Sequence, residues 1–312
     1  MLAQLQEAYP EDVRVAYRHF PLISTHDKAA LSLQASEAAG VQGKFWEMHD
    51  LLFELQSAWA GLSQEEFESW LEEKAGELGL DVDQFMADMN SEEIVAMVQE
   101  TWNHGTNAGF PGTPLLLING RYYNGPSDFL SLESITKMIK LEDEQFTICP
   151  PVTIDQTKSY TATLETEDGD IVVELFPDVA PIAVNSFIFL SENGWYDGVT
   201  FHRVLPGFVA QGGDPTGTGF GGPGYAYNIE VSEEVTFDSA GLLAMANSGP
   251  ESNGSQFFIT YGALPDLNGR FTIFGRVISG MEVVENITPR DPSQNPSLPP
   301  GDVILGVTIE EN

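Results

Sequence analysis

The most informative stretch of the chain runs Phe201-His202-Arg203-Val204-Leu205-Pro206-Gly207-Phe208-Val209-Ala210-Gln211-Gly212-Gly213-Asp214. Two shorter stretches follow it, Met245-Ala246-Asn247-Ser248-Gly249-Pro250 and Asn253-Gly254-Ser255-Gln256-Phe257-Phe258-Ile259. Together they supply one arginine, several side-chain amides and several apolar side chains. They contain no obvious acid, base, nucleophile or set of metal ligands, so any chemistry here depends on placed hydrogen-bond donors and an apolar surface.

The sequence around these stretches predicts a mainly-β domain. Alternating β-type segments cover residues 160–165, 170–176 and 200–204, and one helix is expected over residues 180–192. Glycine-containing turns separate the remaining segments. Short strands with frequent turns and few helices indicate a closed barrel.

The first half of the chain is instead predicted to be mainly helical. We expect a short strand at residues 13–17, stopped by Phe20-Pro21, and a helix-rich block at residues 27–57 with apolar positions three or four apart. Ser63 and Glu66 have the spacing of a capping box and predict a helix running to Gly79.

A further helix is expected to begin at Asp81 and another over residues 128–140. Between them, residues 115–118 and 121–123 predict a hairpin whose tight turn is Asn119-Gly120. Residues 141–157 are interpreted as a linker, because an acidic triplet and then Pro150-Pro151 discourage helix continuation. The predicted domains are therefore residues 1–140 and 158–312.

The composition is that of a packed globular protein with a strongly acidic surface. The chain has 312 residues, 42% of them hydrophobic, and a formal net charge of −34. Residues 1–150 hold 8 basic and 25 acidic residues and residues 151–312 hold 5 and 22, so the acidity is not a tail. A surface this acidic repels phosphate, which disfavours nucleic acid as a partner. A general solubility role and a specific basic partner both stay open.

Cysteine usage and hydropathy exclude several classes of protein. The one cysteine, Cys149, can form no intrachain disulfide and no thiolate zinc cluster. No apolar run approaches the ~18 residues of a membrane helix. The four histidines of the first half, His19, His26, His49 and His104, show no metal-ligand spacing, so no metal and no other cofactor is expected.

The quoted stretches resemble the cyclophilin family of peptidyl-prolyl cis-trans isomerases. So do residues 181–187, 196–203 and 267–277, which gives a resemblance over about residues 158–312. It implies an eight-stranded antiparallel barrel capped by helices, with a groove for proline-containing peptides and unfolded chains.

The resemblance also implies the site residues by position. Arg203, Phe208 and Gln211 are the implied catalytic residues. The implied substrate-binding residues are Val209, Ala246, Asn247, Gln256, Phe258, Leu267 and Phe271. For the apolar members, a role in the core is the alternative. For Gln211 the alternative is an internal barrel bond, and for Arg203 it is a solvated strand face.

These residue types fit rotation about an X-Pro bond. The barrier is about 20 kcal/mol, because resonance gives the C–N bond partial double-bond character. A fixed guanidinium can donate to the proline nitrogen once that nitrogen becomes pyramidal in the twisted state. Arginine stays charged over the neutral range, so the step needs no titrating group, and His202 is expected to be a packed structural residue.

Three positions depart from the family pattern. Val209 replaces a common Met, Phe271 replaces a common His, and Asp266 stands where cyclosporin-sensitive members have Trp. A bulky donor has become a small anion at Asp266, so tight cyclosporin binding is not expected. Residues 217–222 match G-x-G-x-x-G, but no helix follows them, so we do not expect nucleotide binding.

The first half resembles thioredoxin-fold disulfide oxidoreductases of the DsbA type over about residues 1–140. The resemblance rests on residues 17–22, the helical block and residues 112–120, in which Thr113-Pro114 matches that family's cis-proline loop. It implies an α/β domain in which Thr113 and Pro114 bind peptide backbone.

That family's first strand and Cys-x-x-Cys have no counterpart here, so the sequence predicts no dithiol chemistry for this chain. We expect either a truncated start or a degenerate peptide-binding module. No export signal is visible in residues 1–7, whereas the family points outside the cytoplasm, so the compartment stays open.

The function predicted from the sequence is acceleration of X-Pro isomerisation in folding chains. Two alternatives remain: a non-catalytic peptide-binding chaperone, and a fragment of a bifunctional disulfide oxidoreductase and isomerase.

Overall fold

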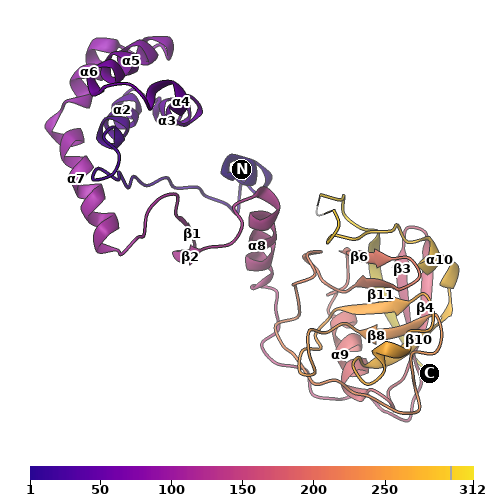
Figure 1. The fold of residues 1–312 in the computed structure, drawn as a ribbon. Coiled ribbons are helices and arrows are strands. Elements are labelled where there is room, and N and C mark those ends of the chain that lie inside the picture. The colour runs from indigo at the N-terminus through magenta and orange to yellow at the C-terminus, as the bar shows by residue number, and fades with distance from the viewer. Residues whose placement is uncertain (296) are drawn as a thin grey trace. The chain divides into compact units, whose positions relative to one another are not determined.

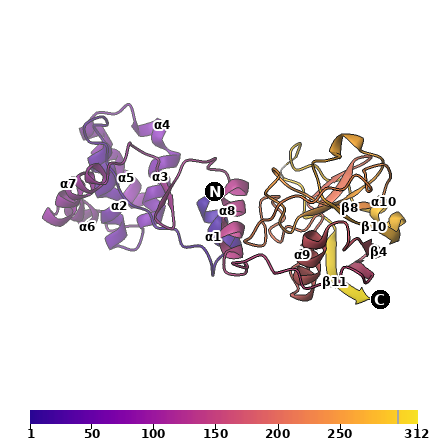
Figure 2. The ribbon, with the colours of Figure 1, turned by 90° about the horizontal axis from the view of Figure 1, so that it is seen from below.

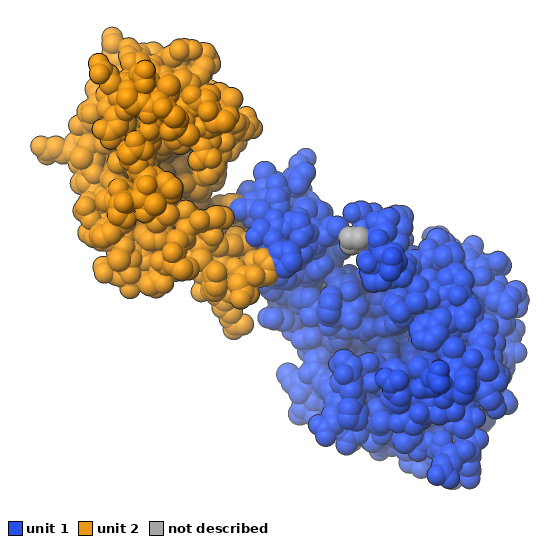
Figure 3. All heavy atoms as spheres, in the orientation of Figure 1, with its two compact units in different colours: residues 1–13, 126–312 blue, residues 14–125 orange. Residues whose placement is uncertain are grey.

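The computed structural model describes residues 1–295 and 297–312. Two compact units make up the chain (Figure 3): unit 1 comprises residues 1–13 and 126–312, and unit 2 comprises residues 14–125. The domain boundaries predicted from the sequence stay a prediction.

Unit 2 is mainly helical, with one small hairpin (Figure 1). Its elements are α2 (Ala29–Val41), α3 (Phe45–Glu54), α4 (Gln56–Trp59), α5 (Gln64–Glu77), α6 (Val82–Met89), α7 (Glu92–Asn107), β1 (Leu116–Ile118) and β2 (Arg121–Tyr123).

Local sequence signals set the ends of these elements. The Ser63 hydroxyl accepts from the Glu66 amide while the Glu66 carboxylate accepts from the Ser63 amide, which confirms the predicted capping box of α5. Asp81 caps α6 by accepting from the Gln84 amide. Asn119 and Gly120 both adopt positive φ, as a tight hairpin turn requires.

The prediction of a strand at residues 13–17 is wrong. Residues 13–20 form neither helix nor strand. Within the described residues, the backbone of 14–20 donates and accepts no backbone hydrogen bond. A strand exists only through its ladder, and no described strand pairs with residues 13–17.

Helix α2 is the centre of the unit 2 core. Its face carries Ala35, Ala38 and Ala39, all fully buried, and small side chains let neighbouring helices approach closely. Phe67 and Phe85, from α5 and α6, fill the space around it.

Unit 1 combines two helices from the first half with the β domain. Its elements are α1 (Leu2–Ala8), α8 (Phe129–Leu141), β3 (Tyr160–Thr166), β4 (Gly169–Leu175), α9 (Pro181–Glu192), β5 (Val199–Thr200), β6 (Arg203–Leu205), β7 (Val209–Gly212), β8 (Leu242–Met245), β9 (Phe257–Thr260), the 3₁₀ helix η1 (Pro265–Leu267), β10 (Ile273–Ser279), α10 (Met281–Asn286) and β11 (Val303–Glu311). Helix α1 packs on α8, and α9 packs on β11 (Figure 2).

Within the described residues, nine strands form one antiparallel sheet in the order β5-β11-β3-β4-β10-β8-β9-β7-β6. The resemblance implied eight. The difference arises at Phe201-His202, which separates β5 from β6 and sends them to opposite ends of the ladder. Because only two residues join these end strands, the sheet must curl until its two edges come together.

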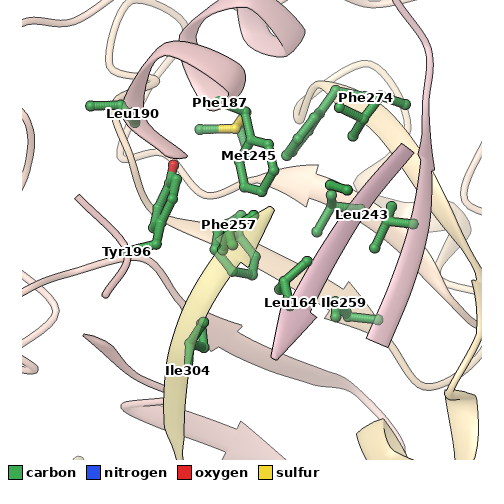
Figure 4. Packing of buried hydrophobic residues seen from close by; sticks show 14 of the residues in the cluster. Leu164, Phe187, Leu190, Tyr196, Leu243, Met245, Phe257, Ile259, Phe274 and Ile304 are labelled. Carbon is green, nitrogen blue, oxygen red and sulfur yellow. The ribbon is translucent and has the colours of Figure 1, made fainter. Parts of the chain in front are cut away.

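The two faces of the sheet bury different clusters. Along β9, Phe257 and Ile259 belong to the main core, whereas Phe258 between them belongs to a second cluster. Alternate residues of a strand point to opposite faces. Figure 4 shows the main core, in which Phe257 lies among Phe187, Tyr196 and Met245.

Among the described residues, no helix is both long and apolar enough to span a membrane.

Candidate active site

The register of three neighbouring strands places Arg203 in one row with Gln211 and Phe258, all of which were predicted as site residues. Arg203 in β6 pairs with Gln211 in β7, and Gln211 pairs with Phe258 in β9. Directly paired residues lie on the same face of a sheet. Arg203, Gln211 and Phe258 therefore form one row across three strands, on the face opposite the main core.

The apolar residues predicted for the site gather around this row. We call this group the outer cluster; it is separate from the main core. Its buried members are Val209, Phe237, Leu242, Ala244, Phe258 and Ile273, and its partly buried members are Phe176, Phe208, Val235, Ala246, Leu264, Leu267 and Phe271. All six apolar residues that the resemblance implied, from four different parts of the chain, lie in it.

Arg203 is held against the edge of the outer cluster. Its side chain is half-buried, and the guanidinium carbon lies 5.9 Å from the centroid of the Phe208 ring. This is the distance range of a cation–π contact. The Asp291 carboxylate is nearby: a hydrogen bond from Ser293 holds the pKa of Asp291 below its usual value, and the charge of Arg203 lowers it further.

The side-chain amides of Gln211 and Gln256 form a hydrogen-bonded pair next to Arg203, which we call the amide relay. Gln211 Nε2 donates to Gln256 Oε1 at 3.0 Å. Gln256 Nε2 in turn donates to the carbonyl oxygens of Gly219 and Gly221, each at 2.9 Å. Those two bonds fix which end of the Gln256 amide is the acceptor, and so orient Gln211.

Asn247 and Ala246 are held by hydrogen bonds to neighbouring segments of the site. Asn247 Nδ2 donates to the Arg270 carbonyl oxygen at 3.1 Å, and the Ala246 amide donates to the Gln256 carbonyl oxygen at 2.9 Å. Asn247 also approaches Asn253 Oδ1 at 3.4 Å. The Ala246–Asn247 segment is thereby tied to the segment that carries Gln256.

The glycine-rich stretch at residues 217–222 binds a side chain of the protein itself. Asp214, fully buried, accepts hydrogen bonds from the amides of Gly219 at 2.6 Å and Gly221 at 3.1 Å. It also accepts from the amide and hydroxyl of Thr216. These amides are therefore occupied, which gives a physical reason for the expectation that the motif does not cradle a phosphate.

His202, next to Arg203, is buried with 3% of its surface exposed. Neither ring nitrogen has a hydrogen-bond partner among the described residues. Burial lowers the pKa of His202; the Asp214 carboxylate raises it, and Arg290 and Arg203 lower it further. A neutral, packed imidazole is the result, in keeping with the structural role expected for it.

The lowered pKa of His202 predicts a pH dependence of stability. In the unfolded chain, His202 becomes protonated as the pH falls below about 6.5. In the folded chain, the pKa of His202 is lower, so protonation requires a lower pH. The free energy of unfolding of the β domain should therefore fall as the pH decreases through that window, by up to about 1.4 kcal/mol per pH unit.

Urea titrations at pH 7.5 and 5.5, followed by amide NMR signals of the barrel strands, measure this effect. His202→Gln should flatten the pH dependence, whereas the matched substitution His104→Gln, at an exposed position, should leave it as in the wild type. Glu230, whose pKa burial raises, contributes with the opposite sign but equally in all three proteins. Equal slopes for wild type and His202→Gln would refute the prediction.

Unit 2 contains a cavity of about 310 Å³. Thr113 contributes to its wall, together with aromatic and histidine side chains that include Tyr17, His19, Phe53 and Trp59. The Thr113-Pro114 peptide bond is cis, as the resemblance implied. Within the described residues, no group of His, Cys, Asp or Glu is arranged to hold a metal ion.

Sequence reasoning missed several residues that shape the site. Phe237, almost fully buried, stacks on Phe258 with ring centroids 6.0 Å apart. Thr272 is also buried, and its hydroxyl accepts from Asn253 Nδ2. Phe237 lies outside the stretches that carry the resemblance, and only the fold brings it to the site. Thr272 lies within residues 267–277, but its buried hydrogen bond to Asn253 could not be read from that stretch. Asp266 lies exposed in η1, next to Leu267 of the outer cluster.

Comparisons with known proteins match both halves of the chain. A family model described as cyclophilin type peptidyl-prolyl cis-trans isomerase/CLD matches residues 161–309, and one described as thioredoxin matches residues 1–140. Peptidyl-prolyl cis-trans isomerase A of Mycobacterium tuberculosis is 47% identical over 180 residues, which cover 52% of this chain and 98% of that protein.

Two further relatives match the same half. Peptidyl-prolyl cis-trans isomerase cypE of Dictyostelium discoideum is 51% identical over 130 residues, covering 41% of this chain and 83% of that protein. A crystal structure of a cyclophilin type peptidyl-prolyl cis-trans isomerase from Cryptosporidium parvum has 40% identity and a TM-score of 0.45, covering 49% of this chain and 99% of that one.

Proposed function

This chain belongs to the cyclophilin-type peptidyl-prolyl cis-trans isomerases, and we propose that its activity resides in Arg203, the outer cluster and the Gln211–Gln256 relay. The substrate is an X-Pro bond in a peptide or an unfolded chain. The first half of the chain is thioredoxin-like, but with a single cysteine it has no dithiol to exchange.

One observation carries the proposal: the row Arg203–Gln211–Phe258 sets a fixed cation and an amide beside an apolar surface. An X-Pro dipeptide has the matching features, an apolar ring next to two polar carbonyl groups. Val209, Phe258 and Leu267 would take the proline ring, while Gln211 and Asn247 would take the flanking backbone.

The proposed mechanism uses no proton transfer by a titrating group. In the twisted state, amide resonance is lost and the proline nitrogen becomes a hydrogen-bond acceptor, to which Arg203 donates. This contact exists only in the twisted state, so it lowers the barrier without tightening substrate binding. The outer cluster holds the ring, and the carbonyl side turns.

The outer cluster should accept the proline ring but bind cyclosporin weakly. Exposed Asp266 places a carboxylate beside Leu267, where an apolar macrocycle would have to desolvate that charge.

The test is the cis-to-trans rate of a short X-Pro peptide with and without the purified full chain. Acceleration in proportion to protein concentration supports the proposal. Binding of the peptide without acceleration would instead favour a chaperone that only holds its clients.

The cavity of unit 2 favours a second candidate function, the binding of an extended peptide without redox chemistry. It is lined by aromatic side chains, and Phe53 on its wall is 62% exposed. Residues 14–20, which contribute Tyr17, His19 and Phe20 to the wall, are extended with an unpaired backbone. A peptide strand can pair with such an edge and place alternate side chains in the cavity.

This candidate predicts that the full chain binds a labelled, proline-free extended peptide, a probe that avoids the isomerase site. Phe53→Ser should weaken that binding about tenfold, through loss of apolar contact. Val95→Ser, which removes an exposed apolar side chain of α7 outside the cavity, serves as the control. Fluorescence anisotropy measures the affinity, and equal affinities for the two variants would exclude the cavity.

A further inference from the structure

The segment between α8 and β3, residues 142–158, packs on the isomerase domain. Phe146, Cys149 and Ile154 lie against the main core. The Phe146 ring meets Phe189 edge-on, with centroids 4.9 Å apart, and lies 6.0 Å from Trp195. The segment therefore has fixed side-chain contacts of its own and is more than a tether.

Further along the segment, hydrogen bonds anchor it to α9. The Thr153 amide donates to Asn185 Oδ1 at 2.9 Å, and Asn185 Nδ2 donates to the Pro151 carbonyl oxygen at 3.1 Å. Asn185 is buried, with 4% of its surface exposed. A buried amide satisfied at both ends holds its partner segment in one register.

The start of the segment is hydrogen-bonded to the glycine-rich loop, which we define as residues 217–224. Gln145 Nε2 donates to the Gly222 carbonyl oxygen at 2.8 Å, and the Phe146 amide donates to the Pro223 carbonyl oxygen at 2.9 Å. The approach is close: a Cβ on Gly224, at φ +86°, would lie 2.4 Å from the Phe146 carbonyl oxygen. Only glycine fits there.

The same loop holds the amide relay of the active site. The carbonyl oxygens of Gly219 and Gly221 accept both protons of Gln256 Nε2, and Gln256 Oε1 accepts from Gln211. Within the described residues, Gln211 Oε1 has no hydrogen-bond partner and is available to a bound peptide.

A loop with this many glycines needs several hydrogen bonds to keep it in one conformation. Glycine loses more conformational freedom on ordering than any other residue. Asp214 accepts from the amides of Gly219 and Gly221. Gln145 and Phe146 donate to the carbonyl oxygens of Gly222 and Pro223, while Phe220 in the same loop is 81% exposed.

We propose that Gln145 and Phe146 are positioning residues of the isomerase: they fix the glycine-rich loop so that its carbonyl oxygens orient Gln256, and through it Gln211, toward the peptide. The inference rests on the proposed function of that relay. It gives the segment joining the two halves of the chain a role in substrate binding.

The test compares Gln145→Glu with Ile148→Ala in the full chain. Gln145→Glu keeps the size of the side chain but removes its donor to Gly222, whereas Ile148, in the same segment, has a side chain that is 75% exposed. Because the relay holds the flanking peptide, Gln145→Glu should raise KM about fivefold with little change in kcat. Ile148→Ala should match the wild type.

A double-mutant cycle separates positioning from general destabilisation. If Gln145 acts through Gln256, then Gln145→Ala should change kcat/KM less than twofold in a Gln256→Ala background, although it changes it about fivefold in the wild type. Additive losses would overturn the proposal, as would wild-type kinetics for Gln145→Glu.

A spectroscopic readout keeps this test independent of catalysis. The side-chain amide NMR signals of Gln256 and Gln211 should shift or broaden in Gln145→Glu and stay in place in Ile148→Ala. If the wild-type chain shows no isomerase activity, the proposed function fails while these signals still decide whether Gln145 orients the relay. Unmoved signals in Gln145→Glu would overturn the positioning role.

Discussion

Replacing Arg203 by alanine should lower kcat/KM for an X-Pro peptide by about 100- to 1,000-fold, the usual cost of removing one donor aimed at a transition state. Arg203 donates only when the proline nitrogen becomes pyramidal, so the loss should fall on kcat and leave KM nearly unchanged. The cation–π contact with Phe208 holds the guanidinium at the edge of the outer cluster before the substrate arrives.

Arg203→Lys distinguishes charge from geometry. Lysine keeps the positive charge but lacks the planar, forked donor of the guanidinium, so it should recover only part of the lost rate. A protease-free assay that follows the peptide signal by NMR line shape avoids any bias from a coupled enzyme. If Arg203→Ala retains more than a third of the wild-type kcat/KM, the arginine-assisted mechanism is excluded.

Replacing Phe257 by alanine should destabilise the β domain by about 3–5 kcal/mol, a large share of the usual stability of a domain. Phe257 is fully buried, and its ring centroid lies 5.8 Å from that of Phe187 and 5.7 Å from that of Tyr196 (Figure 4). The ring of Phe201 also contacts it, with centroids 6.4 Å apart. These rings come from separate segments that cannot collapse into the cavity without moving the sheet.

Native-state hydrogen exchange of the β8 and β9 amides measures this loss within the β domain alone, which avoids a two-state treatment of the whole chain. Phe220→Ala removes the same atoms from a ring that is 81% exposed, and should change stability by less than about 0.5 kcal/mol. A loss below about 1 kcal/mol for Phe257→Ala would mean that the main core tolerates a void at its centre, contrary to its packing.

Much of the site could be predicted because its residues fall in contiguous motifs. Arg203, Phe208, Val209 and Gln211 lie within nine consecutive residues, and the hairpin β6–β7 pairs Arg203 directly with Gln211. The fold class, thioredoxin-like followed by a mainly-β cyclophilin-type domain, is confirmed by both family matches. Which of the site residues act in catalysis stays a prediction.

Other features could not be predicted because they depend on contacts between distant segments. The strand expected at residues 13–17 has the right residues but no neighbour to pair with. Gln145 lies in a stretch whose prolines and acidic residues indicate only a linker, yet its amide reaches Gly222. The glycine-rich motif matches a phosphate loop by spacing, and only the buried Asp214 shows that its amides are already bound.

The sequence by itself determined the local order of the molecule: where helices are capped, where the Asn119-Gly120 hairpin turns, and where the helical block carries apolar residues three or four apart. These follow from backbone preferences and from the period of side chains along one element. The tertiary structure alone decided that the outer cluster is assembled from distant strands and loops, and that Gln145 and Phe146 contact the glycine-rich loop. Such contacts join segments far apart in sequence, and their free energy comes from packing and hydrogen bonds that exist only once the chain has folded.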